Sequence, residues 1–188
     1  DLVISHELTH KIHMSQPSRS WRSVLDSSVL ESDIFNFSRY PRWVTEGYAT
    51  VIETEYTEQG RVNSDYIKAM LQQWATEGQL PRYDALNGST SYQGNSMAYY
   101  QGSAFLFWLQ ANYGQEKLQQ LWKRSVAKKY RDFDDAFTGL FLDSPRTLYK
   151  QFVVEQTVSA KQKKALLGGG KLWQHNDFKV ISSEPSPQ

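Results

Sequence analysis

The chain has 188 residues, of which 21 are Lys or Arg and 20 are Asp or Glu, so its formal net charge at pH 7 is +1. This balance excludes an acidic solvating tail, and it does not favour a nucleic-acid-binding domain, which usually has a strong basic excess. Cysteine is absent, which excludes disulfide scaffolds, cysteine nucleophiles and thiolate metal sites but leaves the cellular compartment open.

Apolar residues recur at helical spacing along most of the chain. The periodic segments predict helices over residues 2–15, 42–57, 65–76, 97–112, 115–129, 132–142 and 145–167. Pro17 ends the first helix, Ser64 caps the third, Gly114 follows the fourth, and Ser144 caps the last. The 6 Trp, 11 Tyr and 9 Phe residues predict an aromatic-rich core. We therefore expect a mainly α fold.

Three segments lie outside these predicted helices. Residues 18–40 follow no single pattern, and residues 82–96 are polar and rich in Gly, Asn and Ser, which predicts a surface loop. The tail, residues 168–188, begins with three glycines and includes a strand-like piece over residues 178–181. We expect residues 1–167 to form one helical domain and the tail to lie outside it.

The sequence favours neither a membrane nor a nucleic acid as partner. The longest apolar run, residues 104–109, is far shorter than the ~20 residues that cross a bilayer. A basic run over residues 123–131 lies on the polar face of an amphipathic helix and is balanced by Asp132, Asp134 and Asp135. Such a run indicates a solvated face.

The first predicted helix carries the sequence His6-Glu7-Leu8-Thr9-His10, an HExxH motif. Residues i and i+4 lie one turn apart on the same face of a helix, so the two imidazoles can bind one Zn²⁺ ion. Glu7 is offset around the helix and can accept a proton from a water that the metal activates. A chance match is expected on the order of once in a hundred chains of this size. We therefore expect one zinc ion per chain.

A catalytic zinc needs a third protein ligand. His13 lies about 10 Å further along the helix axis than His6, too far for both to bind one ion. The metzincin pattern would need glycine at His13 and histidine at Gln16, so that family is excluded. Glu46, early in the second helix, is the remaining candidate. Alone, a glutamate at a helix start more often interacts with the helix dipole, but beside an incomplete two-histidine site we interpret it as a ligand.

HELTH followed by WVTEGYATVIE resembles the gluzincin metallopeptidases, the clan of thermolysin and the zinc aminopeptidases. In that family HExxH precedes a helix with an (N/T)EGxA-like sequence whose Glu is the third ligand, which here corresponds to Glu46. Residues 97–106 resemble the aminopeptidase segment Tyr-x-x-Gly, whose Tyr donates a hydrogen bond to the tetrahedral intermediate. The match assigns this role to Tyr99, and Tyr100 is the second candidate. The alternative role for Tyr99 is that of an aromatic residue packed in the core.

Glu53 lies seven residues after Glu46, two turns along the same face of the second helix. It could accept a hydrogen bond from the outer N–H of a zinc-bound histidine, as residues behind metal ligands usually do. It could equally be a solvated surface acid like Glu55 and Glu58. The sequence leaves these two roles open.

The resemblance covers roughly residues 1–155 and implies the helical half of a thermolysin-like catalytic domain. It implies a zinc peptidase that cleaves peptide bonds with a metal-activated water, Glu7 as general base and Tyr99 as oxyanion donor. The 35 residues between His10 and Glu46 exceed the spacer of typical aminopeptidases and resemble the bacterial "peptidase MA"-type branch, and Thr45 replaces their usual Asn. The preceding β-rich subdomain and the motif for the substrate's amino terminus are missing, so aminopeptidase specificity is not implied.

We expect a peptide or protein substrate, and we expect the 188 residues to be one helical subdomain of a longer protein, with an adjoining N-terminal β subdomain. Residues 178–187 resemble the entry strand of a propeller blade, which implies a following β-propeller, although a disordered terminus fits as well. The alternative function is a non-catalytic binding or scaffold module that retains zinc. Glu7 favours the hydrolase, because a structural site has no use for a base between its ligands.

Overall fold

The structure is a computed structural model that describes residues 2–14, 40–57, 60–88, 92–127 and 131–166. The described residues form helices and no strand, which confirms the predicted mainly α fold. The helices are α1 (Leu2–Met14), α3 (Arg42–Thr57), α4 (Asp65–Glu77), α5 (Tyr92–Tyr113), α6 (Gln115–Val126), α7 (Phe133–Phe141) and α8 (Pro145–Leu166), with two 3₁₀ helices, η2 (Arg61–Asn63) and η3 (Tyr83–Asn87).

Several helix ends follow from capping residues in the sequence. The Ser64 hydroxyl accepts a hydrogen bond from the Ile67 N–H at the start of α4, and the Asp132 carboxylate accepts one from the Asp135 N–H at the start of α7. At the end of α4, Gly78 adopts the left-handed conformation (φ 71°) that glycine reaches without strain. These local signals explain why most predicted helix bounds lie within a few residues of the observed ones.

The largest difference concerns the segment that we expected to be a surface loop, residues 82–96. Residues 83–87 form η3, and α5 begins at Tyr92 rather than at residue 97. Polar residues with low helix propensity favoured a loop, but the helix extends about one turn before the buried residues Met97 and Ala98. The mixed segment 18–40, except residue 40, and the tail 168–188 with its strand-like piece lie outside the described residues.

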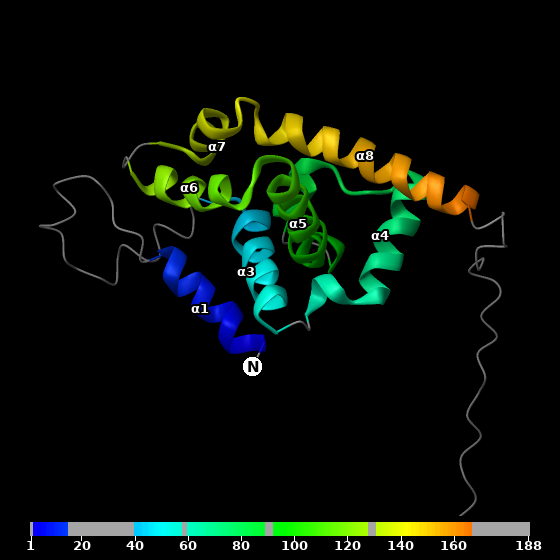
Figure 1. The fold of residues 1–188 in the computed structure, drawn as a ribbon, viewed down its shortest axis with the longest axis horizontal. Helices are drawn as coiled ribbons and strands as arrows, with labels where there is room; N and C mark the ends of the chain where they lie inside the picture. Colours follow the sequence, from blue (N-terminus) through cyan, green and yellow to red (C-terminus); the bar gives the residue numbers. More distant parts are fainter. Residues whose placement is uncertain (1, 15–39, 58–59, 89–91, 128–130, 167–188) are drawn as a thin grey trace, which may run out of the picture.

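The crossing of α3 and α5 forms the centre of the molecule (Figure 1). A Cβ atom on Gly47 of α3 would lie 2.8 Å from the Gly102 carbonyl carbon, and a Cβ on Gly102 of α5 would lie 2.8 Å from the Trp43 carbonyl oxygen. Both distances are shorter than a carbon atom tolerates, so the two backbones meet because each helix has glycine at the contact. Glu46 directly precedes one of these glycines, and Tyr99 lies one turn before the other.

The core around this crossing is rich in aromatic side chains, as the composition predicted. Trp43 is fully buried, and its ring contacts those of Tyr83, Phe105 and Phe133 with centroids 5.1–6.0 Å apart. Helices α4, α6, α7 and α8 surround the central pair, and α1 lies at the edge of the described molecule against α3 (Figure 1). The outward side of α1 exposes Val3, Ile4, Leu8 and Ile12, each 51–66% accessible.

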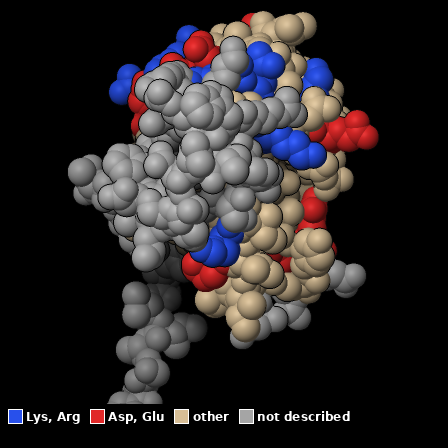
Figure 2. Space-filling view, turned by 90° about the vertical axis from the view of Figure 1, so that its left-hand side faces the viewer, with Lys and Arg blue, Asp and Glu red and all other residues tan. Residues whose placement is uncertain are grey.

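On the face drawn in Figure 2, the visible Lys and Arg side chains lie among Asp and Glu side chains, and the described part shows no continuous patch of one sign. This arrangement agrees with the balanced composition. None of the helices in the described ranges has both the length and the apolar character of a membrane span.

Candidate metal centre

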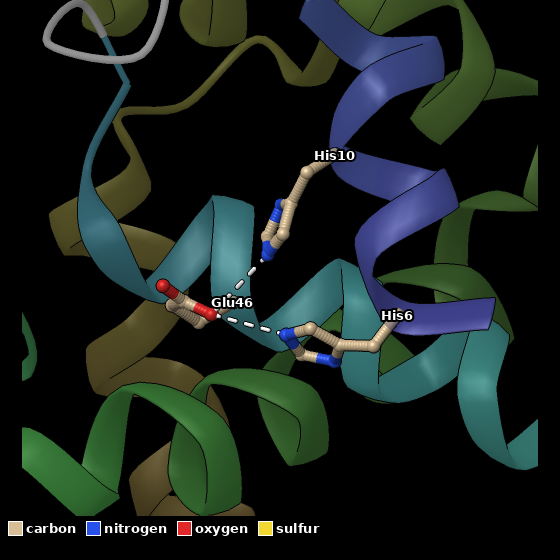
Figure 3. A group of neighbouring side chains, drawn as sticks. All are labelled: His6, His10 and Glu46. Atoms are coloured by element: carbon tan, nitrogen blue, oxygen red, sulfur yellow. Dashed lines mark hydrogen bonds and ion pairs between the residues drawn. The ribbon is translucent and has the colours of Figure 1, made fainter. Parts of the chain in front are cut away.

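His6 and His10 project from successive turns of α1 toward α3 (Figure 3). Their ring centroids are 4.8 Å apart with the planes nearly perpendicular, and both residues are buried, with 7% and 8% of their surface exposed. The i, i+4 spacing of the motif therefore produces the juxtaposition that helix geometry predicts.

Glu46 meets the two histidines from α3. Its Oε2 atom lies 3.3 Å from His6 Nε2 and 3.4 Å from His10 Nε2 (Figure 3). Glu46 is 9% exposed, so the carboxylate is enclosed between the two helices. The structure thus brings together the three residues that the sequence predicted as metal ligands.

The three side chains fit a metal ion. Their ligand atoms all lie within 4.8 Å of one another. A tetrahedral ion with ligand bonds of about 2.0–2.1 Å holds neighbouring ligand atoms about 3.3–3.4 Å apart, which matches both measured His–Glu distances. Two imidazoles and a carboxylate at this spacing could therefore bind one metal ion.

The surroundings keep Glu46 ionised. Burial raises its pKa, but hydrogen bonds from His10, His6 and Tyr99 outweigh this effect and hold the pKa well below its usual range. The same contact raises the pKa of His6 above its usual value, because the Glu46 carboxylate stabilises the imidazolium form. A metal ion at this position would compete with that proton, so metal binding should strengthen as the pH rises through neutrality.

Glu53 lies behind the histidine pair on α3, where it accepts a hydrogen bond from His6 Nδ1 at 3.2 Å. It is 3% exposed, so the solvated-surface alternative does not describe it. Because Nδ1 donates to Glu53, a metal ion that displaced the Nε2 proton would find the Nε2 lone pair of His6 directed toward the centre of the three-residue group. The geometry is the one expected for a residue that orients a metal ligand.

Tyr99 and Tyr100 of α5 face different cavities. The Tyr99 ring stacks against His6, with centroids 6.0 Å apart, and burial together with the nearby Glu46 carboxylate raises the pKa of Tyr99. Tyr100 instead lines a separate cavity between α4, α5 and α8. Of the two tyrosines, Tyr99 is therefore the one beside the three-residue group.

A cavity of about 600 Å³ opens beside His6. Its lining comes from α1, α3, α4, α5 and η2 and consists of Val3, His6, Glu7, Glu53, Gly60, Arg61, Ser64, Ile67 and Tyr99. Glu7 is exposed in this cavity. Glu7 of α1 and Tyr99 of α5 therefore line the same cavity.

His13 is not part of the group. Its ring stacks on Trp122 with centroids 3.8 Å apart and also contacts Tyr48. Burial and the neighbouring His10 lower the pKa of His13 to about 3. His13 is thus a neutral packing residue between α1 and α6, in agreement with its exclusion as a ligand.

The sequence did not reveal two arginines that flank Tyr99. The guanidinium carbons of Arg42 and Arg61 lie 5.3 Å and 4.7 Å from the centroid of the Tyr99 ring, within the range of cation–π contacts. Arg42 also donates a long hydrogen bond, 3.5 Å, to the Tyr99 hydroxyl. These residues are 57 and 38 positions from Tyr99 along the chain, and no local pattern relates them to it.

We compared the chain with family models, with curated proteins and with solved structures, and none of the three comparisons gave a match. The resemblance to the gluzincins therefore depends on the sequence motifs alone. The buried His6–His10–Glu46 group is the independent structural observation that bears on function.

Proposed function

We propose that the protein is a zinc-dependent peptidase whose metal is held by His6, His10 and Glu46. The observation that carries this proposal is the buried group itself, in which both histidines of an HExxH motif meet a carboxylate at distances suited to one tetrahedral ion. On this proposal the chain forms the helical half of a gluzincin catalytic domain and acts on peptide or protein substrates.

On this proposal, three residues of the chain have separate roles in the reaction. A zinc ion bound here would polarise the scissile carbonyl and lower the pKa of a water to about 7. Glu7, at the adjoining cavity, takes a proton from the attacking water and returns it to the leaving amine. The Tyr99 hydroxyl donates a hydrogen bond to the oxyanion, and Glu53 keeps the His6 ring in its binding orientation.

A scaffold that retains a structural metal is the competing function. Structural zinc sites are usually closed by four protein ligands, whereas catalytic sites keep one position open. Among the described residues no fourth His, Cys, Asp or Glu belongs to the group, and a cavity lies beside it. These two features favour the catalytic alternative.

Metal analysis combined with the Glu7→Gln variant tests the proposal. The wild-type protein should bind one zinc ion at neutral pH and cleave peptides from a mixed library, as detected by mass spectrometry. Glu7→Gln should still bind zinc but lose cleavage, while Glu116→Gln, which changes an exposed glutamate on α6, should retain both. A wild-type chain that binds no zinc would refute the proposal, and equal activity of Glu7→Gln would remove Glu7 as base.

A matched pair of tyrosine variants tests the oxyanion donor. Tyr99→Phe should lower kcat by about 10²–10³-fold, because such donors act mainly in the transition state. Tyr100→Phe changes the neighbouring tyrosine, which faces the other cavity, and should leave kcat near that of the wild type. The reverse result would assign the role to Tyr100.

A further inference from the structure

The cavity beside the metal group contains a cation that the proposed chemistry does not use. Arg61 lines this cavity together with Glu7 and Tyr99. Its guanidinium carbon lies 4.7 Å from the centroid of the Tyr99 ring, which holds the charged end of the side chain against the proposed oxyanion donor.

The backbone before Arg61 fixes this position. Gly60 has φ 137°, and a Cβ atom there would lie 2.7 Å from the Thr54 hydroxyl oxygen and 3.2 Å from the Thr54 Cα. Glycine therefore permits the chain to pass directly against the last turns of α3. The Asn63 and Ser64 N–H groups then bond to the carbonyl oxygens of Gly60 and Arg61 and close η2. Arg61 is thus placed relative to α3, the helix that carries Glu46.

Arg61 has no carboxylate partner among the described residues, although Glu7 and Glu53 line the same cavity. Glu53 is occupied by its hydrogen bond from His6. By contrast, Arg146 forms a two-pronged pair with Asp84, and Arg42 donates to the carbonyl oxygen of Asn95. The ring of Tyr99 is the described partner of the Arg61 guanidinium, so its N–H donors remain available within the cavity.

We propose that Arg61 binds a carboxylate of the peptide substrate, close to the bond that is cleaved. A guanidinium presents a planar fork of N–H donors that matches a carboxylate, and such charge-assisted pairs are among the strongest hydrogen bonds in proteins. In a peptide the carboxylate belongs either to the C-terminus or to an Asp or Glu side chain. This inference rests on the proposed peptidase function, because it names the substrate class of that same site.

Binding to an inactive protein tests the inference without relying on turnover. The zinc-loaded Glu7→Gln protein is titrated by calorimetry with four matched peptides. Two share one sequence and end in either a free carboxylate or an amide. The other two end in an amide and carry either one internal Glu or one internal Gln. Arg61 should favour one carboxylate peptide over its neutral counterpart by about 10–100-fold, and adding Arg61→Gln should abolish that preference. Preference for the free acid identifies the C-terminus, and preference for the internal Glu identifies the side chain.

Two further variants test whether Arg61 recognises the charge of the peptide or only holds the Tyr99 ring in place. Arg61→Lys keeps the charge but loses the fork, so it should recover part of the preference. Arg82→Gln changes an exposed arginine that does not line the cavity, and it should bind all four peptides like the parent. Equal weakening of acid and amide by Arg61→Gln, or no peptide binding at all, would overturn the inference.

Kinetics with the otherwise wild-type chain distinguishes failure of the inference from failure of the proposed function. Arg61→Gln should raise KM for the preferred carboxylate peptide by about 10–100-fold more than it changes KM for the neutral peptide. Cleavage of acid and neutral peptides with equal efficiency would refute the role of Arg61 and leave the peptidase intact. Carboxylate-dependent binding without any cleavage by the Glu7-containing chain would support Arg61 recognition and refute the peptidase.

Discussion

At the scale of single residues, the hydrogen bond between His6 and Glu53 has a measurable consequence. Removing the charge of Glu53 makes His6 a less basic ligand and a less firmly oriented one. Glu53→Gln should therefore weaken zinc binding by about 10-fold, toward the low end of such effects because the amide oxygen still accepts a hydrogen bond. Competition with a chromophoric chelator measures this change.

Glu55→Gln is the matched control for that measurement, since Glu55 is exposed on the same helix. Its zinc affinity should equal that of the wild type. If Glu53→Gln and Glu55→Gln had the same affinity as the unmodified chain, the hydrogen bond to His6 would have no role in metal binding.

His13 makes stability depend on pH in a defined direction. Burial, reinforced by His10, lowers its pKa to about 3 from the ordinary value of 6.5. Below pH 6.5 the unfolded chain therefore binds a proton that the folded chain does not, so His13 reduces stability as the pH falls toward 3. Between pH 7 and pH 5 the loss should be on the order of 2 kcal/mol, measured by urea unfolding with chelator present.

His13→Phe isolates this contribution, because phenylalanine keeps a ring against Trp122 and Tyr48 but cannot be protonated. The difference between wild type and variant should grow as the pH falls. His6 acts in the opposite direction, since its raised pKa adds stability at low pH, but it is present in both proteins and cancels. A difference that stayed constant with pH would contradict the prediction.

At the scale of elements, the glycine contact between α3 and α5 determines how closely the two helices approach. A Cβ on Gly47 would meet backbone atoms of Gly102 and Ser103 at 2.8 and 2.9 Å, and backbone cannot move aside as a side chain can. Gly47→Ala should therefore destabilise the fold by about 1–3 kcal/mol and weaken zinc binding, because Glu46 is the adjacent residue. Urea unfolding and metal titration measure the two effects.

Gly88→Ala provides a comparison at a glycine without such crowding. Gly88 has φ −69°, and a Cβ there would meet the nearest atom, the Ala85 carbonyl oxygen, at 3.4 Å. We expect this variant to have nearly the stability and zinc affinity of the wild type. A Gly47→Ala protein as stable as Gly88→Ala would mean that the helix crossing adjusts without cost.

At the scale of the whole molecule, the described residues contact α1 from one side. It packs on α3 and exposes Val3, Ile4, Leu8 and Ile12 on its outer side. A metal bound by His6, His10 and Glu46 would join this helix to the core, so zinc should slow amide hydrogen exchange in α1 far more than in α5. Mass spectrometry of the exchanged protein, with zinc or with chelator, measures the effect, and equal protection of both helices would contradict it.

The sequence predicted the helices and the meeting of His6, His10 and Glu46, for physical reasons that differ between residues. His6 and His10 meet because helix periodicity is local, and Glu46 was found because a two-histidine site needs a further ligand, a choice with which the resemblance to a family motif agrees. The early start of α5 was missed because its first residues include Gly, Asn and Ser, whose low helix propensity favoured a loop. Arg61 was missed because its contact with Tyr99 depends on how distant helices pack, which no local pattern encodes.

The contact between Gly47 and Gly102 also indicates which part of the site can be redesigned. Glu46 and Tyr99 belong to two helices whose backbones meet directly at these glycines, so this contact limits how far the separation of the two residues can change. The histidines and Glu7 belong to α1, whose outer face is unconstrained by the described residues. If the group binds a metal as proposed, substitutions in α1 are therefore the way to change its metal preference, while the α3–α5 crossing is kept unchanged.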